Sequence, residues 1–183
     1  MMPEADGFKT GSLRQARWNH SATAERDGRR VITVVMNTSS RMARQNESRR
    51  LLNFGFEELE RLEKERAEKV RVFYDGGVIP LSSAPSFFHG RLLLPVQDIF
   101  EHLGYSINWN EQYKLVSITH ENGYTATLMT DRDLAVINGD THTLPMPAQV
   151  INDNIYTSIE SIGLLTGTIS EWSIETGVVR FRK

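Results

Sequence analysis

The C-terminal part of this 183-residue chain repeats itself, and the repeat restricts the possible folds more than any other feature. Residues 70–120 align with residues 133–183 at a constant offset of 63 positions and without a gap. The matched pairs are Gly76 and Gly139, Leu81 and Leu144, Ile99 and Ile162, Gly104 and Gly167, Trp109 and Trp172, Val116 and Val179. Because one copy is too small to bury enough surface alone, we expect the two to pack face to face as one pseudo-symmetric α+β domain.

Each copy predicts the same order of elements. Asp75-Gly76 and Asn138-Gly139 lie between short β-rich runs and indicate tight hairpins, since both turn positions need a positive φ. A helix over about residues 96–103 follows Pro95 and ends at Gly104. A strand pair completes the copy.

The first copy resembles the copper amine oxidase N-terminal-like domain. The residues that carry the resemblance are Gly90-Arg91-Leu92-Leu93-Leu94-Pro95-Val96, Ile99-Phe100, Leu103-Gly104 and Trp109. The second copy departs from it at Asn154-Ile155-Tyr156-Thr157-Ser158, where Arg and Pro are usual. The resemblance implies that residues 70–183 are an accessory domain of a secreted or cell-wall protein of a Gram-positive bacterium. It also implies a cell-wall polymer or a protein as partner.

The family name suggests copper, but the residues predict no metal site and no cofactor. Of the five histidines, at positions 20, 89, 102, 120 and 142, no two have H-x-H or i,i+4 spacing. A copper site needs clustered imidazoles. Trp109 and Trp172 could stack on wall glycans, but their matched positions at strand ends favour core packing.

The first third of the chain predicts an antiparallel sheet. Two β-rich runs, residues 18–26 and 29–36, flank Asp27-Gly28, which favours a type I′ hairpin. Residues 31–36 are almost continuously apolar, which is typical of a strand covered on both faces. A helix is predicted over residues 41–54, ending near Gly55.

A second resemblance covers residues 1–56. It is carried, in order, by Asp6-Gly7-Phe8-Lys9-Thr10-Gly11, Ser21-Ala22-Thr23-Ala24, Asp27-Gly28-Arg29-Arg30-Val31-Ile32-Thr33-Val34-Val35, Arg44 and the segment from Glu47 to Phe56. These residues resemble the C-terminal end of the catalytic domain of serine-type D-alanyl-D-alanine carboxypeptidases, the low-molecular-mass penicillin-binding proteins. Ala16-Arg17-Trp18-Asn19-His20 departs from the family, where a small Gly-containing stretch is usual. The implied fold class is α+β, with an antiparallel-sheet fragment of a penicillin-binding/β-lactamase-like domain before the two-repeat domain.

The resemblance assigns a substrate-binding role to Lys9-Thr10-Gly11, the K-T-G motif of that family. Lys9 would supply positive charge toward the substrate carboxylate, and Thr10 a hydroxyl donor to it. Gly11 has no Cβ, so the substrate backbone can approach closely. The implied substrate is the D-Ala-D-Ala end of a peptidoglycan stem peptide, cleaved through a serine acyl-enzyme.

The rest of that catalytic machinery is missing from the 183 residues. Acyl transfer needs an activated serine, and no Ser in the chain is followed by Lys at i+3, as S-x-x-K requires. Ser106-Ile107-Asn108 spells S-x-N, but it comes far after Lys9 and in another domain, so we interpret it as chance. His20 has no acidic neighbour in sequence and is interpreted as structural. We therefore expect no carboxypeptidase activity from this chain alone. Two alternatives stay open, a non-catalytic envelope binding or spacer module and a truncated gene product.

The remaining sequence carries no chemistry. Ten of the thirteen residues at 57–69 are charged, which predicts a helical linker with the i,i+4 pairs Glu57/Arg61, Glu60/Lys64 and Glu65/Lys69. Residues 1–69 hold 14 Lys/Arg and 11 Asp/Glu, and residues 70–183 hold 7 and 12, a balance that does not indicate nucleic acid. No apolar run approaches the roughly 18–20 residues that span a bilayer.

Neither cysteines nor targeting signals identify the compartment. There is no cysteine, so disulfides and thiolate sites are excluded. Residues 1–6 lack the basic and apolar regions of a signal peptide. An extracytoplasmic location, in the envelope or secreted, is therefore expected from the resemblances alone. Three strands and one helix leave the apolar strand little cover, so we also expect residues 9–36 to expose a sheet edge and an apolar face.

Overall fold

The computed structural model describes residues 4–183. Residues 1–3, which belong to the predicted sheet fragment and to the segment that lacks signal-peptide features, lie outside the described part. The chain divides into two compact units. The first is Met1–Lys64 with Phe88–Gly90, and the second is Glu65–Phe87 with Arg91–Lys183. The described residues form several sheets with only three helices, which fits the expected α+β class with strands predominating.

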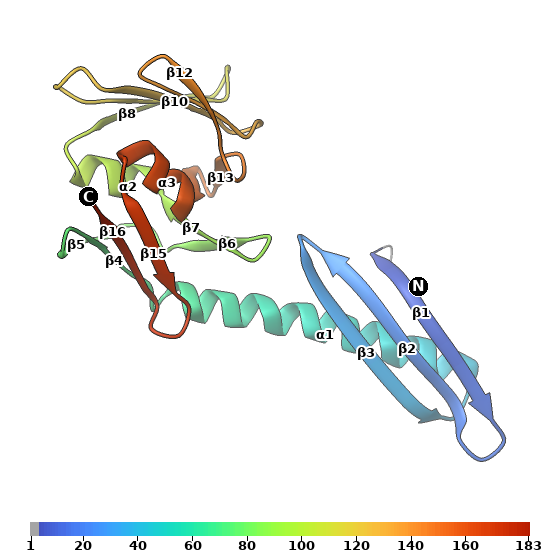
Figure 1. Ribbon diagram of the computed structural model, residues 1–183. Helices are drawn as coiled ribbons and strands as arrows, with labels where there is room; N and C mark the ends of the chain where they lie inside the picture. The colour runs from blue at the N-terminus through green and yellow to red at the C-terminus, as the bar shows by residue number, and fades with distance from the viewer. Residues whose placement is uncertain (1–3) are drawn as a thin grey trace. The chain divides into compact units, whose positions relative to one another are not determined.

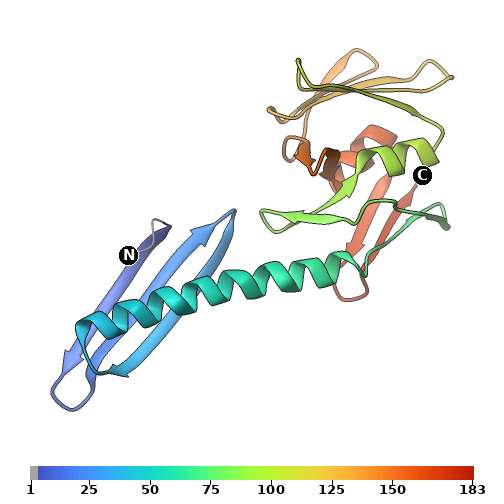
Figure 2. The same cartoon turned by 180° about the vertical axis from the view of Figure 1, so that it is seen from behind.

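The first unit is a three-stranded antiparallel sheet with one helix on one face (Figures 1 and 2). Its elements are β1 (Ala5–Leu13), β2 (Arg17–Arg26), β3 (Arg29–Thr38) and α1 (Arg41–Ala67). The predicted hairpin between β2 and β3 is confirmed, because Asp27 and Gly28 have φ values of 50° and 70°. The core between sheet and helix is small and consists of Ala22, Ala24, Leu52 and Phe56.

The helix does not end near Gly55, so that prediction is wrong. A Cβ at Gly55 would lie 2.6 Å from Cγ1 of Val31. Gly55 therefore lets α1 lie close against β3, and this packing offsets the roughly 1 kcal/mol that a mid-helix glycine costs. The helix continues into the charged segment, where Arg61 forms an i,i+3 ion pair with Glu58 at 2.7 Å. Residues 57–67 are thus helical, as predicted, but they continue α1 without a break.

Strand β3 is covered on one face only, which corrects the expectation of cover on both. Thr33 and Val35 are buried toward α1, whereas Ile32, Val34 and Met36 alternate with them and are 70%, 64% and 71% exposed. We call the side of the sheet that carries Ile32, Val34 and Met36 the outer face. The predicted exposure of an apolar face in this region is confirmed.

The repeat of the sequence is also a repeat of structure. The first copy contains β4 (Arg71–Tyr74), β5 (Gly77–Ile79), β6 (Ser86–Phe88), β7 (Arg91–Pro95), α2 (Val96–His102), β8 (Ser106–Asn110) and β9 (Leu115–Thr119). The second contains β11 (Leu134–Ile137), β12 (Asp140–Thr143), β13 (Gln149–Ile151), β14 (Asn154–Ser158), α3 (Ile159–Thr166), β15 (Ile169–Ser173) and β16 (Val178–Arg182). Every element of the second copy begins 63 residues after its counterpart.

Each of the three sheets of this region contains strands from both copies. Strands β7 and β14, which are counterparts, pair antiparallel in the sheet β13-β14-β7-β6. Strand β16 pairs parallel with β4 in the sheet β15-β16-β4-β5. The counterparts of β16 and β4 are β9 and β11. These two strands do not pair directly but are separated by β10 (Thr125–Met129) in the sheet β12-β11-β10-β9-β8. Because β10 is antiparallel to both, it connects the copies while β9 and β11 keep the same direction.

One hydrophobic core joins both copies. Its fully buried side chains include Leu94, Ile99 and Phe100 from the first copy and Ile162, Leu165 and Phe181 from the second. Helices α2 and α3 lie between the five-stranded sheet and the two four-stranded sheets (Figures 1 and 2). The predicted end of α2 is confirmed, with Gly104 at φ 83°. No helix among residues 4–183 is both long and apolar enough to cross a membrane.

Candidate functional site

The K-T-G residues lie on an edge strand. Within residues 4–183, β1 pairs with β2 and has no strand on its other side. The register places Lys9 opposite Ser21, Thr10 opposite His20 and Gly11 opposite Asn19. Cross-strand partners share a face of the sheet. Lys9 therefore lies on the outer face, Thr10 lies on the α1 face, and the two side chains can approach one ligand only along the free edge.

Lys9 is an available cation on this edge. Its Nζ donates to the carbonyl of Thr10 at 3.1 Å, and it forms no ion pair within residues 4–183. A shallow groove of about 370 Å³ lies beside it, lined also by Ser21 and Arg30. Arg30 is already paired with Asp6 at 2.7 Å and with Glu25, and its hydrogen bond lowers the pKa of Asp6. An anionic ligand in this groove would thus find its free positive charge on Lys9.

Gly11 leaves the free edge open. No heavy atom lies within 4 Å of the position that a Cβ would occupy there. An extended peptide can add to such an edge through main-chain hydrogen bonds. The arrangement can therefore hold the backbone of an extended ligand and attract a carboxylate, but it contributes no nucleophile.

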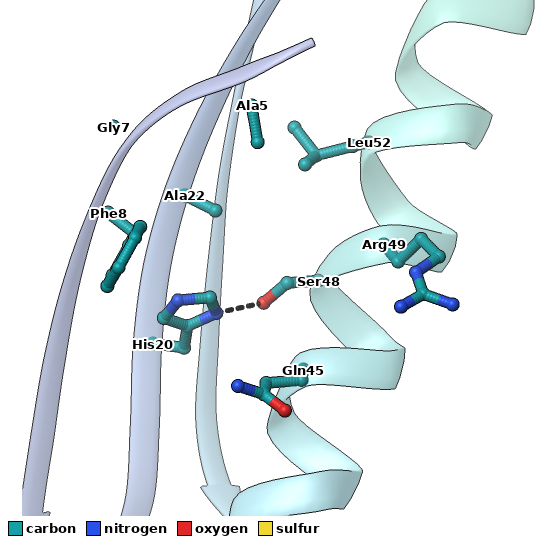
Figure 3. A pocket seen from close by; sticks show the side chains of 9 residues that line it. All are labelled: Ala5, Gly7, Phe8, His20, Ala22, Gln45, Ser48, Arg49 and Leu52. Atoms are coloured by element: carbon teal, nitrogen blue, oxygen red, sulfur yellow. Dashed lines mark hydrogen bonds between the residues drawn. The ribbon is translucent and has the colours of Figure 1, made fainter. Parts of the chain in front are cut away.

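His20 has a partner that the sequence interpretation missed. Its Nδ1 lies 2.7 Å from Oγ of Ser48 on α1, and both side chains are buried (Figure 3). The pair borders a small cavity of about 30 Å³, which has room for one or two water molecules. Figure 3 shows Phe8 from β1 and Leu52 from α1 on its walls. Position i+28 gives no sequence signal, so only the fold could bring these residues together.

The electrostatics of this pair oppose catalysis. Burial lowers the pKa of His20, and the positive charge of Arg44 lowers it further. Arg44 is itself buried, donates to the carbonyl of Asn19 at 3.3 Å and lies 5.2 Å from the ring of Trp18. A neutral imidazole beside a guanidinium resists taking a proton, and Ser48 is only 2% exposed. The hydrogen bond therefore ties β2 to α1, as the structural interpretation of His20 expected.

The histidines of the repeated domain do not form a copper site. His89 lies between β6 and β7, His102 on α2, His120 after β9 and His142 on β12. Nowhere in residues 4–183 do three His, Cys, Asp or Glu side chains come together as metal ligands. The residues present therefore do not fit a copper ion. Trp109 and Trp172 both pack half-buried against the shared core, in agreement with the core interpretation.

Sequence comparison gives one clear relationship. No characterised protein shows significant similarity to the chain. The sequence model of the copper amine oxidase N-terminal domain matches residues 73–181, more than half of the chain and nearly all of the two repeats. The match covers the region whose copies share one core. Through residues 73–181, the chain belongs to the copper amine oxidase N-terminal domain family.

Proposed function

We propose that residues 1–56 are the C-terminal portion of the catalytic domain of a serine-type D-Ala-D-Ala carboxypeptidase that trims peptidoglycan stem peptides. Residues 70–183 are then its accessory domain, and the protein acts outside the cytoplasm, in the cell envelope or secreted. The observation that carries the proposal is the coincidence of the K-T-G motif with a free strand edge that bears an unpaired ammonium group.

The chemistry assigns each motif residue a part in substrate binding. The stem peptide lies extended along β1 and hydrogen-bonds to its free main-chain groups. Lys9 attracts the terminal carboxylate, Thr10 donates its hydroxyl at the edge, and Gly11 leaves room for the peptide. The serine nucleophile, its base and the oxyanion hole come from residues outside these 183, because S-x-x-K is absent here.

The outer face supports the same proposal. Ile32, Val34 and Met36 are large apolar side chains in contact with solvent, on a strand whose other face is already covered by α1. Contiguous exposed apolar residues mark a surface that another element or partner covers. A complete catalytic domain supplies such cover.

The test is D-alanine release by the protein of the whole reading frame from a peptide ending in D-Ala-D-Ala. We expect Lys9→Ala to lower kcat/KM by about 100-fold, the usual loss when one electrostatic contact to the reacting substrate is removed. Lys64→Ala, which removes another exposed lysine of the first unit, should have no effect. Full activity of Lys9→Ala, or no D-alanine release at all, would contradict the proposal.

A second candidate is a non-catalytic envelope binding or spacer module. It is favoured by the repeated domain, which has one extensive core of its own. Co-sedimentation of the 183-residue chain with purified cell-wall sacculi tests it. Retention of the chain supports a binding module, and its complete recovery in the supernatant leaves only the spacer.

A further inference from the structure

A groove of about 550 Å³ opens in the repeated domain, beside Trp109 of β8. Trp109 is half-buried, so that it packs against the core and also lines the groove. Thr130, directly after β10, and Val150 of β13 line it from other parts of the domain. The remaining lining residues are all charged and exposed: Glu111, Lys114 and Asp153.

The polar groups of this groove are available to a ligand. Within residues 4–183 the carboxylates of Glu111 and Asp153 make no hydrogen bond or ion pair. Lys114 has only a loose contact with Asp131, at 4.0 Å. The groove thus presents the carboxylates of Glu111 and Asp153 as hydrogen-bond acceptors and the ammonium group of Lys114 as a donor. The hydroxyl of Thr130 can both donate and accept. All of them line the same groove as Trp109.

The second copy indicates that the fold does not require these polar groups. At an offset of 63 residues, Glu111 corresponds to Ile174 and Lys114 to Gly177, while Asp153 corresponds to Gly90. Trp109 corresponds to Trp172, so the aromatic residue is common to both copies and the polar ring around it is not. The same framework is built with and without these side chains, so they are not needed for packing and are free to contact a ligand.

We propose that the Trp109 groove binds a neutral saccharide unit of a glycan chain. The C–H face of a sugar ring packs on the electron-rich face of an indole. The sugar hydroxyls can donate to Glu111 and Asp153 and accept from Lys114 and Thr130. Two carboxylates repel a phosphate or another anion, and the open groove admits an internal unit of a chain. This proposal names the ligand class of the binding-module candidate and does not depend on the carboxypeptidase.

The test is calorimetric titration of the whole 183-residue chain with the β-1,4-linked N-acetylglucosamine tetrasaccharide, together with a glucose tetrasaccharide. We expect saturable binding of at least one of them at millimolar concentration or below. Trp109→Ala should abolish it, and Trp172→Ala is the matched control that should retain it. Near-UV circular dichroism checks that both variants are folded.

Two exposed positions keep the test independent of folding. Glu111→Gln and Asp153→Asn should each weaken binding about tenfold, since each replaces a charged acceptor of a hydrogen bond, with no change in Tm. Asn also tolerates the left-handed backbone of position 153, where φ is 62°. Binding of neither sugar, or unchanged affinity in these variants, would overturn the saccharide proposal. Either result leaves the carboxypeptidase test with Lys9→Ala unaffected.

Discussion

The close approach of Gly55 to Val31 predicts that Gly55→Ala destabilises the first unit, although alanine has the higher helix propensity. Propensity alone would favour alanine in the middle of α1 by about 1 kcal/mol. The new Cβ, however, would lie 2.6 Å from one methyl group of Val31 and 3.3 Å from the other. Because χ1 of a β-branched side chain is restricted, relief of the 2.6 Å contact must strain Val31 or separate α1 from β3.

The magnitude follows from these two opposing effects. Overpacking of this kind costs about 1–3 kcal/mol, and the propensity gain offsets about 1 kcal/mol of it. We expect a net loss of roughly 1 kcal/mol in the free energy of opening. In a Val31→Ala background the clash is gone, so Gly55→Ala should there be stabilising by about 1 kcal/mol.

The assay is amide hydrogen exchange of α1 and β3, which reports on the first unit alone. Asn53→Ala, at an exposed position of the same helix, is the matched control and should slow exchange slightly. If Gly55→Ala slows exchange as Asn53→Ala does while Val31 is intact, the close packing of helix and strand is refuted.

Three further predictions concern stability. Gly177→Ala should lower the free energy of unfolding more than Gly167→Ala does. The two glycines have similar φ values of 67° and 65°, but only at Gly177 would the new Cβ meet a backbone atom, at 2.8 Å. Urea unfolding compares the two variants, and equal losses of stability would contradict the prediction. The first unit should lose stability as pH falls below 6.5, the ordinary pKa of histidine, because the pKa of His20 is lowered in the folded state and the unfolded chain then binds more protons. Hydrogen exchange between pH 7 and 5 measures this dependence. His20→Gln should flatten it, and an unchanged slope would contradict the prediction. Amides of residues 5–56 should exchange faster than those of residues 70–183, because the first core has four buried residues and the second is far larger; the reverse order would contradict this.

Local rules predicted the parts of this fold that local chemistry determines. The turn at Asp27-Gly28 follows from the two positive φ values that such a turn needs. The repeat predicted the first hairpin, the helix and the last strand pair of each copy, but it missed β6 and β7, their counterparts β13 and β14, and β10, which lies between the copies. The end of α1 was missed because Gly55 does not end the helix but allows it to lie close to Val31 of β3. This close approach exists only once helix and strand pack.

The candidate site divides in the same way. Lys9 was identified by its motif, and the exposed sheet edge was expected because the first unit has so few strands. The role of Lys9 in substrate binding stays a prediction. The partner of His20 was invisible, since Ser48 is 28 positions away on another element. For Trp109 the sequence offered glycan stacking and core packing as alternatives and favoured the core; the structure shows that the residue packs against the core and also lines a groove.

Covalent labelling by a fluorescent penicillin tests the central claim most directly. The 183-residue chain alone should remain unlabelled, because it holds no S-x-x-K serine. The protein of the whole reading frame should be labelled on a serine outside these residues, and Lys9→Ala should slow that acylation whereas Lys64→Ala should not. A label on the 183-residue chain itself, or a labelling rate indifferent to Lys9, would contradict the account.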